Sequence, residues 1–371
     1  MSSGSPSAPA PTAWHVRGVV LPDDEVRDLW LVGDRVTLEP VPNAVTLADR
    51  GFVLPGLVDA HCHLGIRYGA SPVESVGEAR SLALIDRDAG VLAIRDAGSP
   101  YPYPELDDDP EVPRLARAGR HIAPVRRYLR GIGLEVTAEE LPAAVAAQAA
   151  AGNGWIKLVG DWIDRGKGDL APAWDLDAMA RAVEAAHAAG VRVAAHLFAE
   201  ESVAVMVRAG VDSVEHGTGL SEDDIAEMAA RGTALVPTLV NIENFPSIAA
   251  QAEPKFPGYA AHMRRLYERF PRVVAAAYEA GVPIYVGSDA GGGVRHGEAV
   301  AEMLLLRERA GMSTEDVLRA GSWGAREWLG FPGLVEGGLA DLVVYDDDPR
   351  VDLTVLRTPR LIVLRGRPVR R

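Results

Sequence analysis

The sequence predicts an α/β protein: a (β/α)8 TIM barrel with a small composite β-sandwich domain formed by the N- and C-terminal segments. Three observations lead to this prediction. The chain has 371 residues, enough for a barrel of roughly 250 residues and an accessory domain. About eight short apolar runs alternate with helical stretches rich in Ala, Glu and Arg, which is typical of a parallel sheet. The two ends of the chain share a strand-rich pattern that differs from the middle.

The two ends of the chain differ in composition from the middle. Residues 1–13 are rich in Ser, Pro and Ala and have neither the basic region nor the apolar region of a secretory signal, so we expect a disordered tail. Short strand-like runs separated by turn residues fill 14–54, and ADLVVYDDDP and RLIVLRGRPV repeat this pattern near the other end. We therefore expect 14–54 and 334–371 to form the composite domain and 55–333 to form the barrel.

Eight segments are candidates for the barrel strands: LVDAHCH (57–63), GVLAIRDAG (90–98), HIAPV (121–125), WIKLVGD (155–161), VRVAAHL (191–197), SVEHG (213–217), TALVPTL (233–239) and PIYVGSD (283–289). Between the strands, residues 175–189 predict a helix that ends at Gly190. An open doubly wound sheet is the alternative architecture. It would need a Gly-rich phosphate loop after the first strand, and HCHLG is not such a loop.

Composition narrows the class of protein. The net charge of -14 and the absence of an extended basic run argue against nucleic acid or an anionic membrane as a partner. One cysteine excludes an internal disulfide and is compatible with a reducing compartment. No uncharged apolar run is long enough to span a bilayer. We expect a cytoplasmic protein that acts on a small molecule, and assembly into a homo-oligomer stays open.

Polar residues collect at the expected carboxyl ends of the barrel strands, where the chemistry of such barrels takes place. Side chains alternate along a strand, so two of the histidines in HCH face the same way, while Cys62 faces away and is expected to be buried packing. Each polar residue alone has an ordinary structural explanation, but together they predict a metal site. His187 lies on a helix and is expected to be structural. The candidate ligands are His61, His63, Lys157, His196, His216 and Asp289.

The motifs PGLVDAHCH, EHG, GSDAG and EGGLADLVVYDDDP, together with Lys157 and His196, resemble the amidohydrolase superfamily. Within it, the chain is most similar to the imidazolonepropionase-like and Xaa-Pro dipeptidase-like metal-dependent hydrolases, in which the lysine of strand four is carboxylated and bridges two metals. The resemblance implies that His61, His63 and Asp289 hold one metal and that His196 and His216 hold the other. Carboxylated Lys157 would lie between them. Zinc is the default metal, and manganese, cobalt or iron would fit the same ligands.

The resemblance also implies a reaction. A metal-bound hydroxide would cleave an amide C–N bond in a dipeptide, an N-acyl amino acid or a cyclic amide, with Asp289 as general base and acid. The enzyme would be a dipeptidase or another hydrolase acting on carbon–nitrogen bonds.

Two alternatives stay open. One is a deaminase or hydrolase that acts on a heterocycle with a single metal. Such deaminases usually carry an acid three residues after the strand-five histidine, where this chain has Ala199, followed by Glu200 and Glu201. The other is a catalytically silent barrel that serves as a binding module. Barrels of that kind typically lack metal ligands, whereas this chain has all of the expected ones.

Several residues near the strand ends are candidates for substrate contacts, since an arginine can hold a carboxylate through two hydrogen bonds. In the resembling dipeptidases a Gly-Gly-His segment usually follows strand three. This chain has GIGLEV after the expected third strand, with Leu134 at the approximate place of the histidine, which departs from the dipeptidase pattern. The candidate contacts are Arg67, Tyr68, Arg95, Arg126, Arg127, Tyr128, Arg130, Asn241 and His296.

Overall fold

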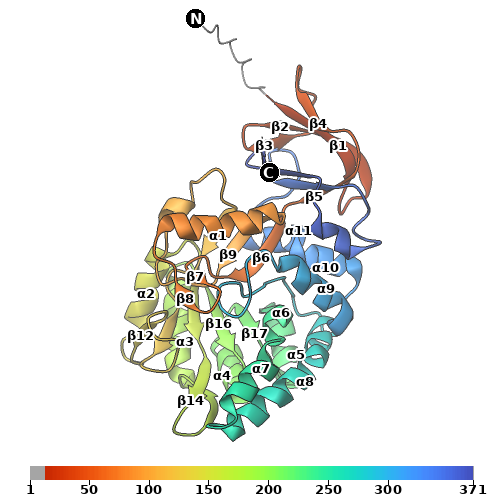
Figure 1. Cartoon of the computed structure of the whole chain (residues 1–371). Helices are drawn as coiled ribbons and strands as arrows, with labels where there is room; N and C mark the ends of the chain where they lie inside the picture. Colours follow the sequence, from red (N-terminus) through yellow and green to blue (C-terminus); the bar gives the residue numbers. More distant parts are fainter. Residues whose placement is uncertain (1–12, 371) are drawn as a thin grey trace, which may run out of the picture.

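Both ends of the chain contribute strands to one eight-stranded sheet (Figure 1). The computed structural model describes residues 13–370. The order in the sheet is β21-β20-β19-β5-β1-β2-β3, and β4 pairs with β1. The strands are β1 (Trp14–Val20), β2 (Glu25–Val32), β3 (Arg35–Thr37), β4 (Val45–Ala48), β5 (Phe52–Pro55), β19 (Leu342–Tyr345), β20 (Leu361–Leu364) and β21 (Arg367–Pro368). These ladders form a single sheet, so a sandwich of two facing sheets stays a prediction.

The terminal sheet has an apolar core of its own, which includes Val16, Leu29, Val53 and Val344. The domain bounds themselves stay predictions. The predicted tail, 1–13, lies outside the described residues except for Ala13, which is buried.

The middle of the chain forms two parallel sheets, which confirms the predicted α/β class. One sheet has the order β10-β9-β6 and the other has the order β12-β11-β13-β16-β17-β18. The bounds are β6 (Leu57–Cys62), β9 (Val91–Asp96), β10 (Arg114–Arg117), β11 (Ile122–Pro124), β12 (Leu134–Val136), β13 (Trp155–Val159), β16 (Arg192–Leu197), β17 (Ser213–His216) and β18 (Ala234–Val236). Two short hairpins, β7 (Ile66–Arg67) with β8 (Ser71–Pro72) and β14 (Asp161–Asp164) with β15 (Asp169–Pro172), follow β6 and β13.

Residues 283–290 include the expected eighth strand, 283–289, and link the two sheets. The Tyr285 N–H donates to the Leu235 carbonyl of β18 at 3.0 Å, and the Ala60 N–H of β6 donates to the Val286 carbonyl at 2.7 Å. Two short strands lie where the third barrel strand is expected. Of these, β10 pairs with β9, whereas β11 pairs with β13 at a single position. No regular ladder joins β10 to β13 within residues 13–370, so a closed eight-stranded ring stays a prediction.

Eleven α-helices connect the strands within the described residues. The predicted helix 175–189 is α3, and its N-cap Asp175 accepts a hydrogen bond from the Ala178 N–H. No described helix is long and apolar enough to cross a membrane. The helices are α1 (Val76–Asp88), α2 (Leu141–Ala151), α3 (Leu176–Ala188), α4 (Glu200–Ala209), α5 (Glu222–Arg231), α6 (Leu239–Ile242), α7 (Phe245–Ala252), α8 (Pro257–Glu279), α9 (Ala299–Ala310), α10 (Thr314–Gly321) and α11 (Trp323–Leu329).

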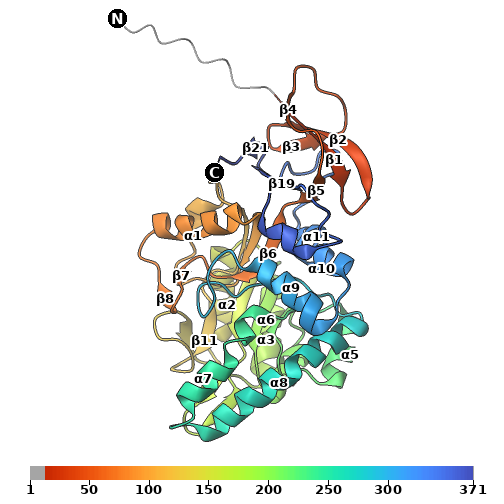
Figure 2. The same ribbon diagram turned by 45° about the vertical axis from the view of Figure 1, so that its right-hand side comes forward.

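Helices α6, α7 and α8 follow β18 and bring apolar side chains to the carboxyl ends of the strands. Figure 2 shows α7 and α8 side by side at the end of the molecule that is remote from the terminal sheet. Phe245 and Ile248 of α7, and Tyr259 and Met263 of α8, line the cavity described below. The long insertion after β18 therefore supplies one wall of the candidate site.

Candidate metal centre

Two histidines and an aspartate meet where β6 and segment 283–290 end. His61 lies on β6 and His63 follows that strand directly, so both side chains point to the same side. Their Nε2 atoms lie 3.2 Å and 3.1 Å from the Oδ1 atom of Asp289. Two imidazole nitrogens and a carboxylate oxygen in this arrangement can bind one divalent cation.

A second pair of histidines faces the same cavity. His196 lies on β16 and His216 ends β17, and the Nδ1 atom of His196 is 3.0 Å from the Nε2 atom of His216. Burial lowers the pKa of both imidazoles, that of His216 to about 3. Neutral imidazole is the form that binds metals. The two facing nitrogens therefore form a second potential pair of ligands.

Lys157 of β13 approaches the first group of ligands. Its Nζ atom lies 3.3 Å from the Nε2 atom of His61, and its side chain lines the same cavity as His196 and His216. Burial lowers the pKa of Lys157 to about 8. A neutral amine has a free lone pair, so addition of carbon dioxide to form a carbamate is chemically open to this side chain.

Outer partners orient the imidazoles. The Nδ1 atom of His63 lies 2.6 Å from the Gly98 carbonyl oxygen, and that of His216 lies 2.7 Å from the Thr238 hydroxyl. The Nε2 atom of His196 lies 3.9 Å from Asp161 Oδ1, and neither of these buried atoms has a hydrogen-bond partner. Metal-binding histidines usually donate their outer N–H to such groups.

Glu215 is the outer partner of His61. Its Oε2 atom lies 2.6 Å from His61 Nδ1, and both of its oxygens accept hydrogen bonds from Arg95. All three side chains are almost fully buried. Burial opposes the ionisation of Glu215, but the charge of Arg95 holds its pKa well below the usual range. Glu215 stands inside the EHG motif, yet the sequence analysis gave it no role because only its neighbour resembled a ligand.

Asp289 is held as an anion in a fixed position. Burial opposes its ionisation, but contacts with His61 and His63 hold its pKa well below the usual range. The side-chain amide of Asn241 donates to its Oδ2 atom at 2.7 Å. Asp289 and His216 both adopt the left-handed backbone region, with φ of 58° and 66°. Such backbone outliers concentrate at functional sites.

Asp59 fastens β6 to segment 283–290. Its Oδ1 atom accepts hydrogen bonds from the N–H groups of His61 and Ser288, and its Oδ2 atom accepts one from the Ser288 hydroxyl. Burial and the nearby charge of Asp86 raise the pKa of Asp59 to about 7. This link fixes the relative positions of the backbone that carries His61 and Asp289.

The candidate ligands line one cavity of about 300 Å³. The same cavity is lined by two of the predicted substrate contacts, Tyr128 and Asn241, and by a large set of apolar side chains. The apolar lining residues are Ile66, Ala70, Leu129, Trp162, Phe198, Phe245, Ile248 and Met263.

The other predicted substrate contacts do not line this cavity. Arg67 pairs with Glu78 and Glu74, and Arg95 pairs with buried Glu215. Arg127 lies 3.3 Å from Asp164. The sequence cannot show these pairings, because each acidic partner comes from a different turn, helix or strand.

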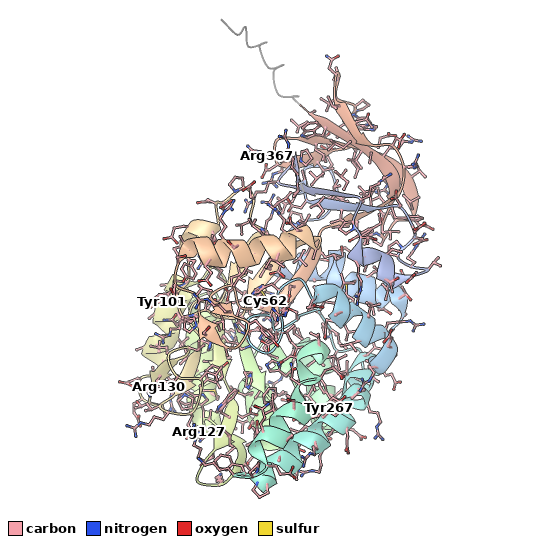
Figure 3. The ribbon with its side chains drawn as sticks, in the orientation of Figure 1. Cys62, Tyr101, Arg127, Arg130, Tyr267 and Arg367 are labelled. Atoms are coloured by element: carbon pink, nitrogen blue, oxygen red, sulfur yellow. The ribbon has the colours of Figure 1, made fainter. Side chains whose placement is uncertain are left out.

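The remaining four lie elsewhere as well. Tyr68 is exposed and stacks with Arg295, and Arg130 is exposed (Figure 3), as is Arg126. His296 is buried against Asp86, with its Nδ1 atom 2.7 Å from Oδ2. None of them lines the cavity.

His121 is a lining residue that the sequence analysis missed. The segment HIAPV was expected to be the third strand, which would put His121 at the opposite end of the barrel from the site. In the structure the third parallel position is β10, and His121 follows its carboxyl end in the segment Gly119-Arg120-His121. His121 therefore lines the cavity, whereas Leu134 lies on β12 and does not. Burial lowers its pKa well below the usual value, and its Nε2 atom has no hydrogen-bond partner.

Cys62 and His187 lie outside the ligand set, as predicted. Cys62 is fully buried within the apolar core (Figure 3). His187 lies on α3, where its Nε2 atom is 2.8 Å from Asp212.

A family model described as the amidohydrolase family matches residues 52–369. The chain belongs to the amidohydrolase family. This confirms the resemblance drawn from the motifs. Amidohydrolases are typically metal-dependent, and the family together with its hydrolase neighbours supports a hydrolase. An uncharacterized protein of Mycobacterium tuberculosis (strain ATCC 25618 / H37Rv) is 51% identical to this amidohydrolase over 354 residues, which is 95% of each chain.

Two solved structures resemble this amidohydrolase over nearly its whole length. A Xaa-Pro dipeptidase with bound methionine has a TM-score of 0.82 and 22% identity, covering 97% of this chain and 100% of its own. The ochratoxinase of Aspergillus niger has a TM-score of 0.79 and 18% identity, covering 96% and 95%. At these identities the likeness shows a shared fold.

Proposed function

We propose that the chain is a metal-dependent hydrolase that cleaves an amide C–N bond. The arrangement of four imidazoles carries this proposal. Each turns one ring nitrogen toward the common cavity, and three of them hold the other within 2.6–2.7 Å of an outer oxygen: Glu215 for His61, Gly98 for His63 and Thr238 for His216. The outer nitrogen of His196 lies 3.9 Å from Asp161. That pattern is typical of metal ligands. A closed (β/α)8 barrel would bring the strand ends that carry them to one face.

The residues fit two divalent cations. His61, His63 and Asp289 would hold one, His196 and His216 the other, and carboxylated Lys157 would bridge them. Imidazole and carboxylate ligands favour zinc and also accept manganese, cobalt or iron. Bound there, the cations would supply Lewis-acid activation of water and of the scissile carbonyl.

The proton transfers fall to Asp289. Its carboxylate would take a proton from the attacking water and pass it to the departing nitrogen, as general base and then general acid. The hydrogen bond from Asn241 to Oδ2 holds the carboxylate plane during both transfers. The apolar wall formed by α7 and α8 would limit the access of bulk water to the reacting groups.

The candidate substrates are dipeptides, N-acyl amino acids and cyclic amides. We propose that the reaction takes place in the cytoplasm and that the protein binds neither nucleic acid nor membranes. A deaminase that uses one metal is less well supported. Ala199 occupies the position of the expected acid, and Glu200 is engaged with His262 at 2.9 Å and with Arg269 at 3.4 Å.

Metal content and native mass test the proposal. The parent protein, grown with zinc or manganese and bicarbonate, should contain about two metal ions per chain and carry the added mass of one carbon dioxide. Lys157→Ala should lose the added mass and much of the metal, together with hydrolysis of whichever dipeptides, N-acyl amino acids or lactams the parent cleaves. One metal ion that is unaffected by the substitution would contradict the bridged centre.

A further inference from the structure

The cavity beside the candidate ligands has mainly aromatic and aliphatic walls. Phe198 follows β16 and meets Phe245 of α7 edge to face, with ring centroids 4.9 Å apart. Met263 of α8 is buried, and Ile248 of α7 is 38% exposed at the rim. Trp162 of the hairpin β14–β15 closes another side, against the ring of Tyr128. Apolar surface of this kind binds aromatic or branched aliphatic groups.

This wall carries no fixed positive charge. Among residues 13–370, Lys157 is the lining residue with a cationic side chain, and it belongs to the proposed metal centre. The arginines on the neighbouring loops are engaged elsewhere or exposed, as described above. A free carboxylate placed against this wall, away from the proposed cations, would lose its water and find no guanidinium to replace it.

Two polar side chains of the lining, His121 and Tyr128, are placed to meet a substrate. His121 is almost fully buried and has an unpartnered Nε2 atom. Tyr128 lies beside it, with ring centroids 5.1 Å apart. A neutral imidazole and a phenol hydroxyl can hydrogen-bond to a carbonyl or an amide N–H.

We infer that the substrates are neutral amides that carry an aromatic or branched aliphatic group and have no free carboxylate next to the scissile bond. This inference rests on the proposed function and narrows it. The apolar group would occupy the space between Phe198, Phe245 and Met263, while His121 and Tyr128 would meet the polar atoms of the substrate. Free dipeptides and N-acyl amino acids would be poor substrates.

A matched pair of amides tests the inference. N-(2-phenylethyl)benzamide and N-benzoylphenylalanine share one skeleton and differ by a single α-carboxylate. The metal-loaded parent should cleave the neutral amide with a kcat/KM at least about tenfold higher. Equal rates, or a preference for the carboxylate, would overturn the inference.

Substitution at the rim gives a second test. Ile248→Arg places a cation where the side chain already reaches solvent. The ratio of kcat/KM for the neutral amide to kcat/KM for N-benzoylphenylalanine should therefore fall by about tenfold. Ile248→Gln has a similar length without the charge and should leave the ratio of the two rates at the parent value. A ratio that shifts equally in both variants, or in neither, would show that charge at this wall does not select the substrate.

Binding separates failure of the inference from failure of the proposed function. If neither amide is cleaved, the affinity of each for the metal-loaded protein is measured by calorimetry. Tighter binding of the neutral amide would support the inference while the hydrolase proposal fails. Tighter binding of N-benzoylphenylalanine, or binding of neither compound, would overturn the inference.

Discussion

The buried carboxylate of Glu215 orients the imidazole of His61, and the candidate metal centre depends directly on this contact. Glu215 contacts His61 and Arg95 and also accepts a hydrogen bond from the Ser213 hydroxyl at 2.5 Å. Arg95 also donates to the Ala60 carbonyl at 2.6 Å. The side chains of His61, Arg95 and Glu215 therefore link β6, β9 and β17 beneath the ligands. Loss of the Glu215 charge should therefore weaken metal binding, and it should also destabilise the fold because it leaves the Arg95 guanidinium buried without a counter-charge.

Glu215→Gln keeps the shape of the side chain and removes its charge. The His61 imidazole would lose its anionic partner, so we expect metal affinity to fall by about 10- to 100-fold, measured by titration against a competing chelator. Ser213→Ala is the control, because it removes a hydrogen bond to the same carboxylate and keeps the charge. Unchanged affinity in Glu215→Gln would show that this carboxylate does not tune the ligand.

The single thiol offers another test at this scale. Cys62 is fully buried, and burial raises the pKa of its thiol well above the usual value. We expect the native protein to resist a disulfide reagent such as dithiobis(nitrobenzoate), and the urea-unfolded protein to react at one thiol per chain. Rapid labelling of the native protein would place the thiol at a surface instead.

The candidate ligands could be found from sequence because two local features indicate them. Side chains alternate along a strand, and functional residues of a barrel lie at the carboxyl ends of its strands. His61 and His63 are two residues apart, so their common direction follows from the backbone alone. The substrate arginines could not be judged in this way. Whether Arg95 is free depends on Glu215, which lies 120 residues away and is brought close only by the fold.

At the scale of elements, the third strand shows where the pattern failed. Its residues are RLAR, and the two charged side chains interrupt the apolar run that is typical of a buried strand. In the structure both arginines form ion pairs, Arg114 with Asp341 and Arg117 with Asp107. The more apolar HIAPV fits the pattern of a buried strand better, and a strand there predicts that His121 lies away from the site.

Helix α8 is tied to the elements beside it through a histidine with two acidic partners. His262 lies 2.9 Å from Asp169 of β15 and 2.9 Å from Glu200 of α4. The hydrogen bond with Glu200, and then that with Asp169, raises the pKa of His262, and the bond from His262 lowers the pKa of Glu200 to about 2.

These shifts predict a pH window of stability. The contribution of His262 is complete below its unfolded pKa of about 6.5 and is lost as the pH rises through its higher folded pKa. The contribution of Glu200 is complete above its unfolded pKa of about 4.3 and is lost as the pH falls toward its lower folded pKa. The difference in melting temperature between the parent and His262→Gln should therefore be largest between these two values. A difference that is constant with pH would contradict the ion pair.

At the scale of the whole molecule, one buried aspartate joins the terminal sheet to the body. Asp341 precedes β19, and its Oδ2 atom accepts hydrogen bonds from Arg114 of β10 at 2.6 Å and from Arg326 of α11 at 2.7 Å. Both Asp341 and Arg326 are almost fully buried.

Asp341→Asn should destabilise the whole protein by about 3–5 kcal/mol, because it leaves the Arg326 guanidinium buried without a counter-charge. Urea unfolding measures this change. Asp346→Asn is the matched control, since its partner Arg360 meets it at the surface, and we expect a far smaller effect. Equal effects of the two substitutions would contradict the importance of the buried pair.

The shared sheet also affects how the protein is made. Strand β5 pairs with β1 on one side and with β19 on the other, so during synthesis it keeps an open edge until residues 342–345 have left the ribosome. An open edge can pair with other chains. The terminal sheet can therefore be completed only after the ribosome has synthesised the middle of the chain, and slow or interrupted translation would leave a strand that can aggregate.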